Sequence, residues 1–403
     1  MYRSYRGSRR KSGCLIPILV ALCIVAALVL FFVQRNVSFT PEGMVLRLPF
    51  TDKTVLLGKG EEAPEEDVNL VIDAPEEPEK EPFEEPKEEP EEPVLSEYET
   101  RIVKSIFVPR SVVLDASAFD ALLAQAKDSE INTFVLEVKA ENGRLAFAST
   151  AELAANSEAN AADNTALKNA LTKLEMQGIH AVAQMSCFRD NRAPRNQRAL
   201  AVRTKKKALW LDPDEFTWLN PYSADAVAYL KTVLTDLYTL GFEEVMLTNV
   251  SFPVKGRTSL ISYAQAEETT QQAAITAFAQ QMRAVAVEKG KQLSFFYDNQ
   301  TPTEEDPVPG GQKLTDLMGV FYRIYGAVEP VENGRGVDTA VLDAMQAAIG
   351  EAGFPTRFVP VLTIGKKVNT ADLVDLAYSA QSKGTGCLYI QADGKYDNIL
   401  FGK

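Results

Sequence analysis

The C-terminal part of the chain, residues 98–403, has the pattern of an α/β protein that folds as a (β/α)8 barrel of the TIM type. Eight short apolar runs alternate with segments of helical periodicity over about 300 residues. A glycine stands between most helical segments and the next apolar run, where helices commonly end. An open, doubly wound sheet would carry a Gly-rich loop after its first strand, whereas Val108-Pro109-Arg110-Ser111 contains no glycine. The sequence therefore favours the barrel.

The individual elements follow from where these patterns begin and end. The apolar runs predict strands at Ile102–Val108, Thr133–Lys139, His180–Met185, Glu244–Asn249, Gln292–Tyr297, Gly319–Arg323, Phe358–Thr363 and Cys387–Gln391. The helical periodicity predicts helices at Ala116–Lys127, Thr165–Gln177, Ala224–Leu240, Gln271–Lys289, Leu314–Leu317, Thr339–Ala352 and Ala371–Lys383. The glycines expected to end helices are Gly178, Gly241, Gly290, Gly353 and Gly384.

The first 33 residues have the pattern of a membrane anchor. Residues 15–33 carry no charge, and nineteen residues nearly span the ~30 Å hydrocarbon core of a bilayer. The run is longer than the apolar part of a cleaved signal peptide and ends without a small-residue cleavage site. Basic residues precede it, which places that end in the cytoplasm. We predict a basic cytoplasmic tail (1–14) and a single-pass transmembrane signal anchor (15–33), with the barrel on the extracytoplasmic side of the cell membrane.

Two further segments separate this anchor from the barrel. Residues 34–60 predict a membrane-proximal β hairpin turning at Pro41-Glu42-Gly43, with an unstructured stalk as the alternative. Residues 61–97 form a disordered linker rich in Pro and Glu, since like charges repel and proline blocks regular structure. The linker serves as a spacer, or else binds cations or a protein partner. With 18 acidic residues against two Lys in residues 61–100, it accounts for more than the whole net charge of −13.

The composition of the remaining chain excludes several functions. The barrel is nearly neutral and has no basic footprint for nucleic acid. The single histidine, His180, begins the third predicted strand, so it is expected to be structural and a metal site built on several imidazoles is excluded. The four cysteines have no spacing typical of zinc or of a disulfide framework. We therefore predict neither a metal nor another cofactor.

Polar side chains near the ends of the predicted strands are the candidate site residues, because the chemistry of such barrels lies at the carboxyl ends of the strands. These residues are Glu137, Lys139, Arg189, Asp190, Thr248, Asn249, Asp298, Tyr322, Arg323 and Gln391. Glu137 and Lys139 are two residues apart, so they are expected to share a face and point into the mouth; a structural ion pair is the alternative. Asp298 is either a second acid or a turn residue.

Two other groups of residues have a functional and a plainer explanation. Aromatic rings could stack on sugars or simply pack in the core; they are Trp210, Trp218, Tyr222, Tyr297, Tyr322 and Tyr325. The basic stretch from Arg192 to Lys207 is either a solvated loop or a surface that faces an anionic envelope polymer or the membrane.

The order of several short motifs resembles the glycoside-hydrolase-type barrel domain of bacterial membrane-anchored envelope proteins, a family of largely unassigned chemistry. The motifs are Glu130–Lys139, Gly143–Leu145, Leu209–Pro213, Trp218–Tyr222, Gly241–Pro253, Val320–Tyr322 and Gly386–Ala392. The resemblance covers residues 102–400 and implies a barrel that acts on a carbohydrate or cell-wall polymer. The family usually has Asp at the positions of Glu137, Asn220 and Thr248. After the position of Thr248 it usually has a Tyr and an Arg, where this chain has Asn249 and Ser251.

These departures leave two hypotheses for the function. In the first, the barrel is a glycosidase in which Glu137 works with Asp298 or Asp190, because glycoside hydrolysis generally needs two carboxyl groups. The remaining strand-end residues are then expected to bind substrate: Lys139, Arg189, Thr248, Asn249, Tyr322, Arg323 and Gln391. In the second, the barrel has lost catalysis, since Thr248 replaces the family's fourth-strand Asp, and serves as a glycan-binding or scaffold module.

Overall fold

The computed structural model describes residues 37–40, 43–47, 54–57, 96–127, 129–263, 269–298, 308–328, 339–363, 377–379 and 381–391. The chain divides into two compact units, residues 1–89 and 90–403. The predicted anchor at 15–33 and almost all of the linker at 61–97 lie outside the described residues. In the part of the chain that is described, no helix has the length and hydropathy needed to cross a membrane.

The first unit contains a small antiparallel sheet. Strand β1 (Val37–Thr40) pairs with β2 (Gly43–Arg47), which in turn pairs with β3 (Thr54–Leu57). Thr40 lies opposite Gly43, so the hairpin turns at the predicted position. The third strand was not predicted.

The second unit is the closed parallel barrel that the sequence predicts. Its eight strands follow the order β10-β11-β4-β5-β6-β7-β8-β9 around the ring, so neighbours in the chain are neighbours in the sheet and β11 closes onto β4. The strands are β4 (Lys104–Val108), β5 (Thr133–Lys139), β6 (His180–Ser186), β7 (Glu244–Thr248), β8 (Gln292–Tyr297), β9 (Ile324–Ala327), β10 (Phe358–Thr363) and β11 (Leu388–Gln391).

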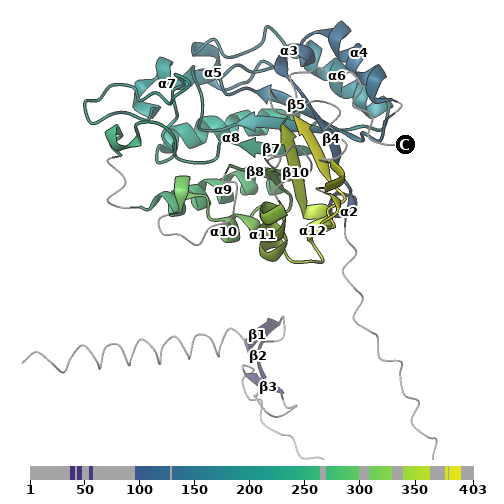
Figure 1. The fold of residues 1–403 in the computed structure, drawn as a ribbon. Coiled ribbons are helices and arrows are strands. Elements are labelled where there is room, and N and C mark those ends of the chain that lie inside the picture. The colour runs from purple at the N-terminus through teal and green to yellow at the C-terminus, as the bar shows by residue number, and fades with distance from the viewer. Residues whose placement is uncertain are drawn as a thin grey trace, which may run out of the picture. The chain divides into compact units, whose positions relative to one another are not determined.

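Helices surround these strands (Figure 1). The α-helices are α2 (Glu97–Thr100), α3 (Arg110–Val113), α4 (Ala116–Ala126), α5 (Glu152–Asn156), α6 (Thr165–Met176), α7 (Ala193–Asn196), α8 (Ala224–Thr239), α9 (Gln271–Glu288), α10 (Leu314–Met318), α11 (Thr339–Ile349) and α12 (Phe354–Arg357). Short 3₁₀ turns are η1 (Arg198–Leu200), η2 (Thr258–Leu260) and η4 (Pro309–Gly311). Most of the predicted helix Ala371–Lys383 lies outside the described residues.

Side chains that alternate along the strands build two buried layers. On β5, Phe134 and Leu136 face the layer between barrel and helices, whereas Val135 belongs to the cluster inside the barrel. Parallel strands covered on both faces read as continuous apolar runs, which explains why their ends were predicted well. Cys187 lies in the outer layer and Cys387 in the inner one; both are free.

Two predictions about this unit are wrong. The sixth strand is β9 at Ile324–Ala327, not Gly319–Arg323, because Phe321 turns into the outer layer and stacks on Phe295 with ring centroids 5.1 Å apart. Gly353 has a negative φ and precedes α12; Gly350, with φ +89°, ends α11 instead. The shifted strand matters for function, because it moves Tyr322 and Arg323 from the end of a strand to its beginning.

A buried ion pair lies inside the barrel at the amino-terminal ends of its strands. Arg323 Nη1 lies 2.8 Å from Glu244 Oε2, and neither side chain is exposed. His180 Nε2 is 3.2 Å from the same oxygen, as suits its predicted structural role. Burial acts to raise the pKa of Glu244, but the charge of Arg323 and the bond to His180 lower it to about 2.

The same arginine ties α2 to this end of the barrel. Arg323 Nη2 donates to the carbonyl oxygen of Tyr98 at 2.8 Å, and its guanidinium lies over the Tyr98 ring, 4.2 Å from the centroid. Tyr322 completes the contact by donating to the carbonyl oxygen of Glu99 at 2.9 Å. The segment that leads into the barrel thereby closes the end opposite the candidate site.

Replacing Arg323 should destabilise the protein strongly. Arg323→Met leaves the buried charge of Glu244 without its arginine and with only His180 beside it, which costs about 3–5 kcal/mol of unfolding free energy. Chemical denaturation followed by circular dichroism measures this loss. The matched control is Lys383→Met, which breaks an exposed pair with Asp343 and should cost less than about 1 kcal/mol. Equal losses in the two variants would contradict the structural role given to Arg323.

Candidate functional site

Glu137 places one carboxyl group at the mouth of the barrel. It lies opposite Gln184 of β6, whose side-chain oxygen accepts a hydrogen bond from Tyr389 of the inner cluster at 3.0 Å, so Glu137 faces the barrel interior. The backbone N–H of Arg110 donates to Glu137 Oε2 at 3.0 Å. The pKa of Glu137 is raised, first by burial and then by the charge of Glu141, against the lowering effect of the Arg110 hydrogen bond.

Asp298 supplies a second carboxyl group, directly after β8. Phe296 packs against the inner cluster, and Asp298 lies two residues further on the same face. The buried Gln312 fixes it: Asp298 N–H donates to Gln312 Oε1 at 3.1 Å, and Gln312 Nε2 donates to Asp298 Oδ2 at 2.9 Å. Gln312 Nε2 also donates to the carbonyl oxygen of Val250 at 3.1 Å, which ties this clamp to the end of β7.

The environment of Asp298 favours its protonated form. The side chain of Asp298 is exposed at the mouth, and the buried Gln312 holds its carboxyl group. Loss of hydration raises its pKa to about 7, with a further rise from the charge of Glu141, against opposing effects of Gln312 and Lys255. Asp298 is therefore an accessible carboxyl group whose pKa is raised above that of a free aspartate. This arrangement is typical of a catalytic acid.

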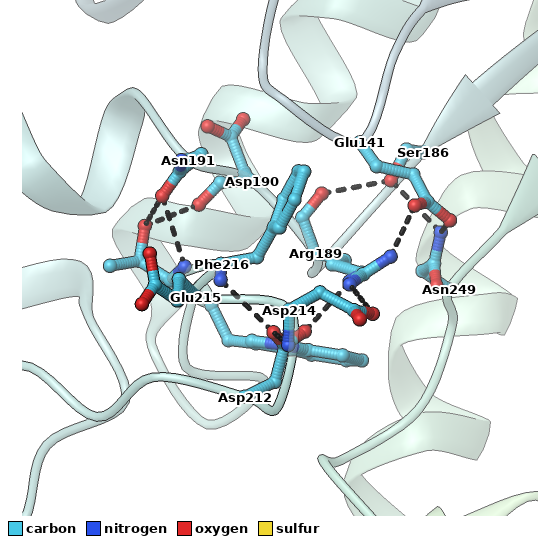
Figure 2. A network of polar contacts seen from close by, with 12 residues as sticks. Glu141, Ser186, Arg189, Asp190, Asn191, Asp212, Asp214, Glu215, Phe216 and Asn249 are labelled. Carbon is cyan, nitrogen blue, oxygen red and sulfur yellow. Dashed lines mark hydrogen bonds and ion pairs between the residues drawn. The ribbon is translucent and has the colours of Figure 1, made fainter. Parts of the chain in front are cut away.

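Glu141, in the turn after β5, is a third carboxyl group that was not among the predicted site residues. Its oxygens accept hydrogen bonds from Arg189 Nη1 and, at 3.0 Å, from Asn249 Nδ2 (Figure 2). Its negative charge adds to the raised pKa of both Glu137 and Asp298. The sequence shows a carboxylate two residues after Lys139. Only the structure shows that the turn after β5 brings this carboxylate to Arg189 and Asn249 at the mouth of the barrel.

Arg189 is the centre of this network. Figure 2 shows its guanidinium between three carboxylates, those of Glu141, Asp212 and Asp214. Nε lies 2.8 Å from Asp212 Oδ2, and Nη2 lies 2.7 Å from Asp214 Oδ2. The guanidinium also stacks over the Phe216 ring, 4.3 Å from its centroid. Arg189, predicted to bind substrate, is thus occupied by protein groups and positions Glu141.

Thr248 and Asn249 lie at the mouth, where the fourth strand ends. Asn249 has a left-handed backbone with φ +51°, a conformation that asparagine tolerates better than most residues. In that geometry its side chain donates both to Glu141 and to Ser186 Oγ, the latter at 3.1 Å. Thr248 is almost fully buried, and its carbonyl oxygen accepts from Cys187 N–H at 2.9 Å. Asn249 therefore orients the carboxylate of Glu141, which the turn after β5 supplies.

The prediction that Glu137 and Lys139 share a face is wrong. The register shifts between them, so that Glu137 pairs with Gln184 but Lys139 pairs with the next residue, Met185, which faces the outer layer. Such a β-bulge redirects the side chains that follow it. Lys139 is fully buried, and its Nζ lies 2.7 Å from Asp190 Oδ2. The ion pair exists, but its acid is Asp190 rather than Glu137.

Asp190 is likewise not available to a substrate. It is fully buried, and its Oδ1 accepts from the N–H groups of Arg192 at 2.8 Å and Ala193 at 3.0 Å. With Lys139 on the other oxygen, its carboxylate is saturated by protein donors. Its close approach to the turn after β5 requires Gly143, where an added Cβ would lie 2.3 Å from Asp190 Oδ1.

The remaining predicted residues divide between the two ends of the barrel. Gln391 ends β11 at the mouth, where Thr363 Oγ1 donates to it at 3.4 Å. Tyr322 and Arg323 lie at the opposite end, which corrects their predicted role in substrate binding. Of the aromatic candidates, four are buried and pack in the core: Trp210, Trp218, Tyr297 and Tyr325. Among the described residues no group of three or more His, Cys, Asp or Glu is placed to hold a metal ion.

The contact between Gly143 and Asp190 can be tested with a matched pair of glycines. Gly143→Ala and Gly178→Ala each place Cβ on a left-handed backbone, with φ +81° and +68°, at a cost of about 1–2 kcal/mol. Only Gly143→Ala also pushes into Asp190, since nothing lies within 4 Å of the Cβ at Gly178. Thermal unfolding should show an additional loss of about 1–3 kcal/mol for Gly143→Ala. Equal losses would mean that the turn relaxes away from Asp190.

Solved structures share this fold at low sequence identity. The glycoside hydrolase domain of PgaB (BpsB) from Bordetella bronchiseptica is 15% identical, with 74% of this chain and 96% of that chain covered and a TM-score of 0.55. An inactive mutant of a GH20 exo-β-N-acetylglucosaminidase from Vibrio harveyi is 10% identical, with 72% and 50% covered and a TM-score of 0.52. A hypothetical protein from Ruminiclostridium thermocellum is 22% identical over 47% of this chain and 96% of that chain, with a TM-score of 0.42.

The first two likenesses agree with the barrel and extend to the fold alone. No curated protein matches the chain. A family profile described as "Putative glycosyl hydrolase domain" matches residues 105–324, which is more than half of the 403 residues. The chain therefore belongs to this family of glycosyl-hydrolase-type domains.

Proposed function

We propose that this barrel is a glycoside hydrolase in which Asp298 is the proton donor and Glu137 is the second carboxyl group. The observation that carries the proposal is the accessible Asp298 carboxyl group, whose pKa is raised to about 7. Glu137 stands on another strand at the same end of the barrel, where glycosidases of this fold carry their acids. Two carboxyl groups that flank the scissile bond are the usual requirement for glycoside hydrolysis.

Glu141 is a positioning residue in this proposal. Burial is the main cause of the raised pKa of Asp298, and the neighbouring negative charge of Glu141 adds to it because it disfavours ionisation of a carboxyl group. Arg189 and Asn249 hold Glu141 in place, and Asp212 and Asp214 hold Arg189. The long segment after β6 thus acts on the acid through this chain of contacts.

The proposal also includes a glycan as the substrate and an extracytoplasmic location for the barrel. The family description and the glycoside hydrolase named for the Bordetella structure support a glycan as substrate. The uncharged run at 15–33 and the basic residues before it support a membrane-anchored protein with an extracytoplasmic barrel. Glycans of the cell envelope or its surroundings are then the polymers within reach.

A second candidate function is a glycan-binding module without catalysis. The observation that favours it is the fourth strand, which ends in Thr248 and Asn249 where the resemblance leads us to expect an acid. Asn249 orients Glu141 but has no proton to transfer near neutral pH. In this case the barrel would bind the same polymers and leave them intact.

A screen of the full-length protein against purified wall polysaccharides separates the two functions. Glu137→Gln and Asp298→Asn should each lower the rate of cleavage by about 10²–10⁴-fold, because each removes a proton-transferring group. Binding of the polymer should persist in both variants. Asp120→Asn is the control, since it removes an exposed carboxylate on the outer helix α4. Binding without cleavage by the wild type would instead establish the module.

The proposed acid predicts the pH dependence of the reaction. A proton donor must be protonated to act, and the pKa of Asp298 is about 7. The value of kcat/KM should therefore fall tenfold per pH unit above about pH 7, whereas a fall at low pH should report protonation of Glu137. Asp298→Asn should abolish this alkaline limb together with most of the activity. A limb that persists unchanged in the residual activity of Asp298→Asn would assign it to another group.

Glu141→Gln tests the positioning role directly. Removing the negative charge of Glu141 should lower the pKa of Asp298, so the alkaline limb of kcat/KM should move to lower pH. Asp214→Asn is the matched control, because it also removes a carboxylate from Arg189 but one that is largely exposed. If both variants leave the limb in place and only lower stability, Glu141 is merely structural.

A further inference from the structure

A cavity of about 530 Å³ begins beside the candidate site. Two of its lining residues follow site residues closely in the chain: Asn142 comes directly after Glu141, and Asn191 comes two residues after Arg189. Three arginines line it as well, Arg144, Arg192 and Arg195. The cavity is therefore lined by residues of two of the loops that build the mouth of the barrel.

The positive charges of these arginines are not balanced by carboxylates. Arg192 Nη1 donates to the carbonyl oxygen of Ser157 at 2.8 Å. Arg195 donates to Asn191 Oδ1 at 2.8 Å and to the carbonyl oxygen of Glu215 at 3.2 Å. These neutral acceptors fix the guanidinium groups without neutralising them, whereas Arg189 is surrounded by three carboxylates.

Arg144 is the least constrained of the three. It is exposed, and its guanidinium makes no hydrogen bond or ion pair with any residue that the structure describes. The cavity lining contains one acidic residue, Glu158, so the lining as a whole carries a net charge of +2. Asparagine side chains make up much of the rest, and these both donate and accept hydrogen bonds, as recognition of sugar hydroxyl groups requires.

The positive charge extends towards the candidate catalytic groups. The pKa of Arg110 is lowered, first by burial and then by the charge of Arg144, with Arg192 adding to the effect and Glu137 opposing it. Arg110 is the residue whose backbone N–H binds Glu137. The cavity and the carboxyl groups of the site are thus within electrostatic range of each other.

We propose that this cavity is a subsite for a negatively charged group, a carboxylate or a phosphate, on the glycan that the barrel binds. The inference rests on the proposed function for the location of the glycan, and it narrows the substrate class to anionic polysaccharides. Guanidinium groups bind carboxylates and phosphates through paired, charge-assisted hydrogen bonds. A neutral glycan would leave the arginines without a charged partner, and a glycan of free amino sugars would be repelled.

Binding measured by calorimetry on the full-length protein tests the subsite. The probes are tetragalacturonate, phosphorylated maltotetraose, maltotetraose and the tetrasaccharide of chitosan. We expect the two anionic probes to bind at least tenfold more tightly than maltotetraose and the chitosan probe to bind most weakly. The stronger of the two anionic probes identifies the charged group. Equal affinity for neutral and anionic probes, or no binding of either anionic probe, would overturn the proposal.

A matched pair of arginines separates a specific subsite from general attraction. Arg144→Gln should weaken binding of the anionic probes about tenfold or more, because it removes hydrogen bonds to a charged group. Arg203→Gln is the control, since Arg203 is an equally exposed arginine outside this cavity. An equal loss in the two variants would show that only net charge matters and would overturn the subsite.

Two outcomes distinguish a failure of the proposed hydrolase activity from a failure of the proposed subsite. If anionic probes bind selectively but no polysaccharide is cleaved, the subsite stands and the hydrolase fails. If neutral and anionic polysaccharides are cleaved at equal rates, and Arg144→Gln cleaves both as well as the wild type, the hydrolase stands and the subsite fails.

Discussion

The candidate site depends on one guanidinium group. Arg189 joins the turn after β5, through Glu141, to the long segment after β6, through Asp212 and Asp214. Burial works to raise the pKa of Asp212, but the bonds from Arg189 and Trp218 lower it, so Asp212 stays charged beside the arginine. Since Glu141 adds to the effect of burial on the pKa of Asp298, this ion-pair network contributes to the protonation of the candidate acid.

The charges near the mouth are divided into two regions of opposite sign. Glu137, Glu141 and Asp298 concentrate carboxyl groups at the strand ends, whereas Arg144, Arg192 and Arg195 line the adjoining cavity. Arg110 lies where the regions meet, bound through its backbone to Glu137 and repelled by two of the arginines. In the function proposed above, the carboxyl groups handle protons and the arginines select the polymer.

The barrel was predictable from sequence because parallel strands buried on both faces appear as apolar runs. The strands Thr133–Lys139 and Phe358–Thr363 were predicted to the residue. Local irregularities were not predictable. The bulge that turns Lys139 away from Glu137 has no sequence signal, and the apolar run around Phe321 fits either a strand or a helix end. Glu141 and Gln312 were missed because their roles depend on contacts between residues far apart in the chain.

Helix α2 is held at the end of the barrel opposite the candidate site. The polypeptide enters the barrel next to Tyr98, which is held by Arg323 at the sealed end of the strand ring. Its working end, with Glu137 and Asp298, is therefore free of the chain's entry point. A polymer that binds beside Glu137 and Asp298 would therefore not compete for space with α2.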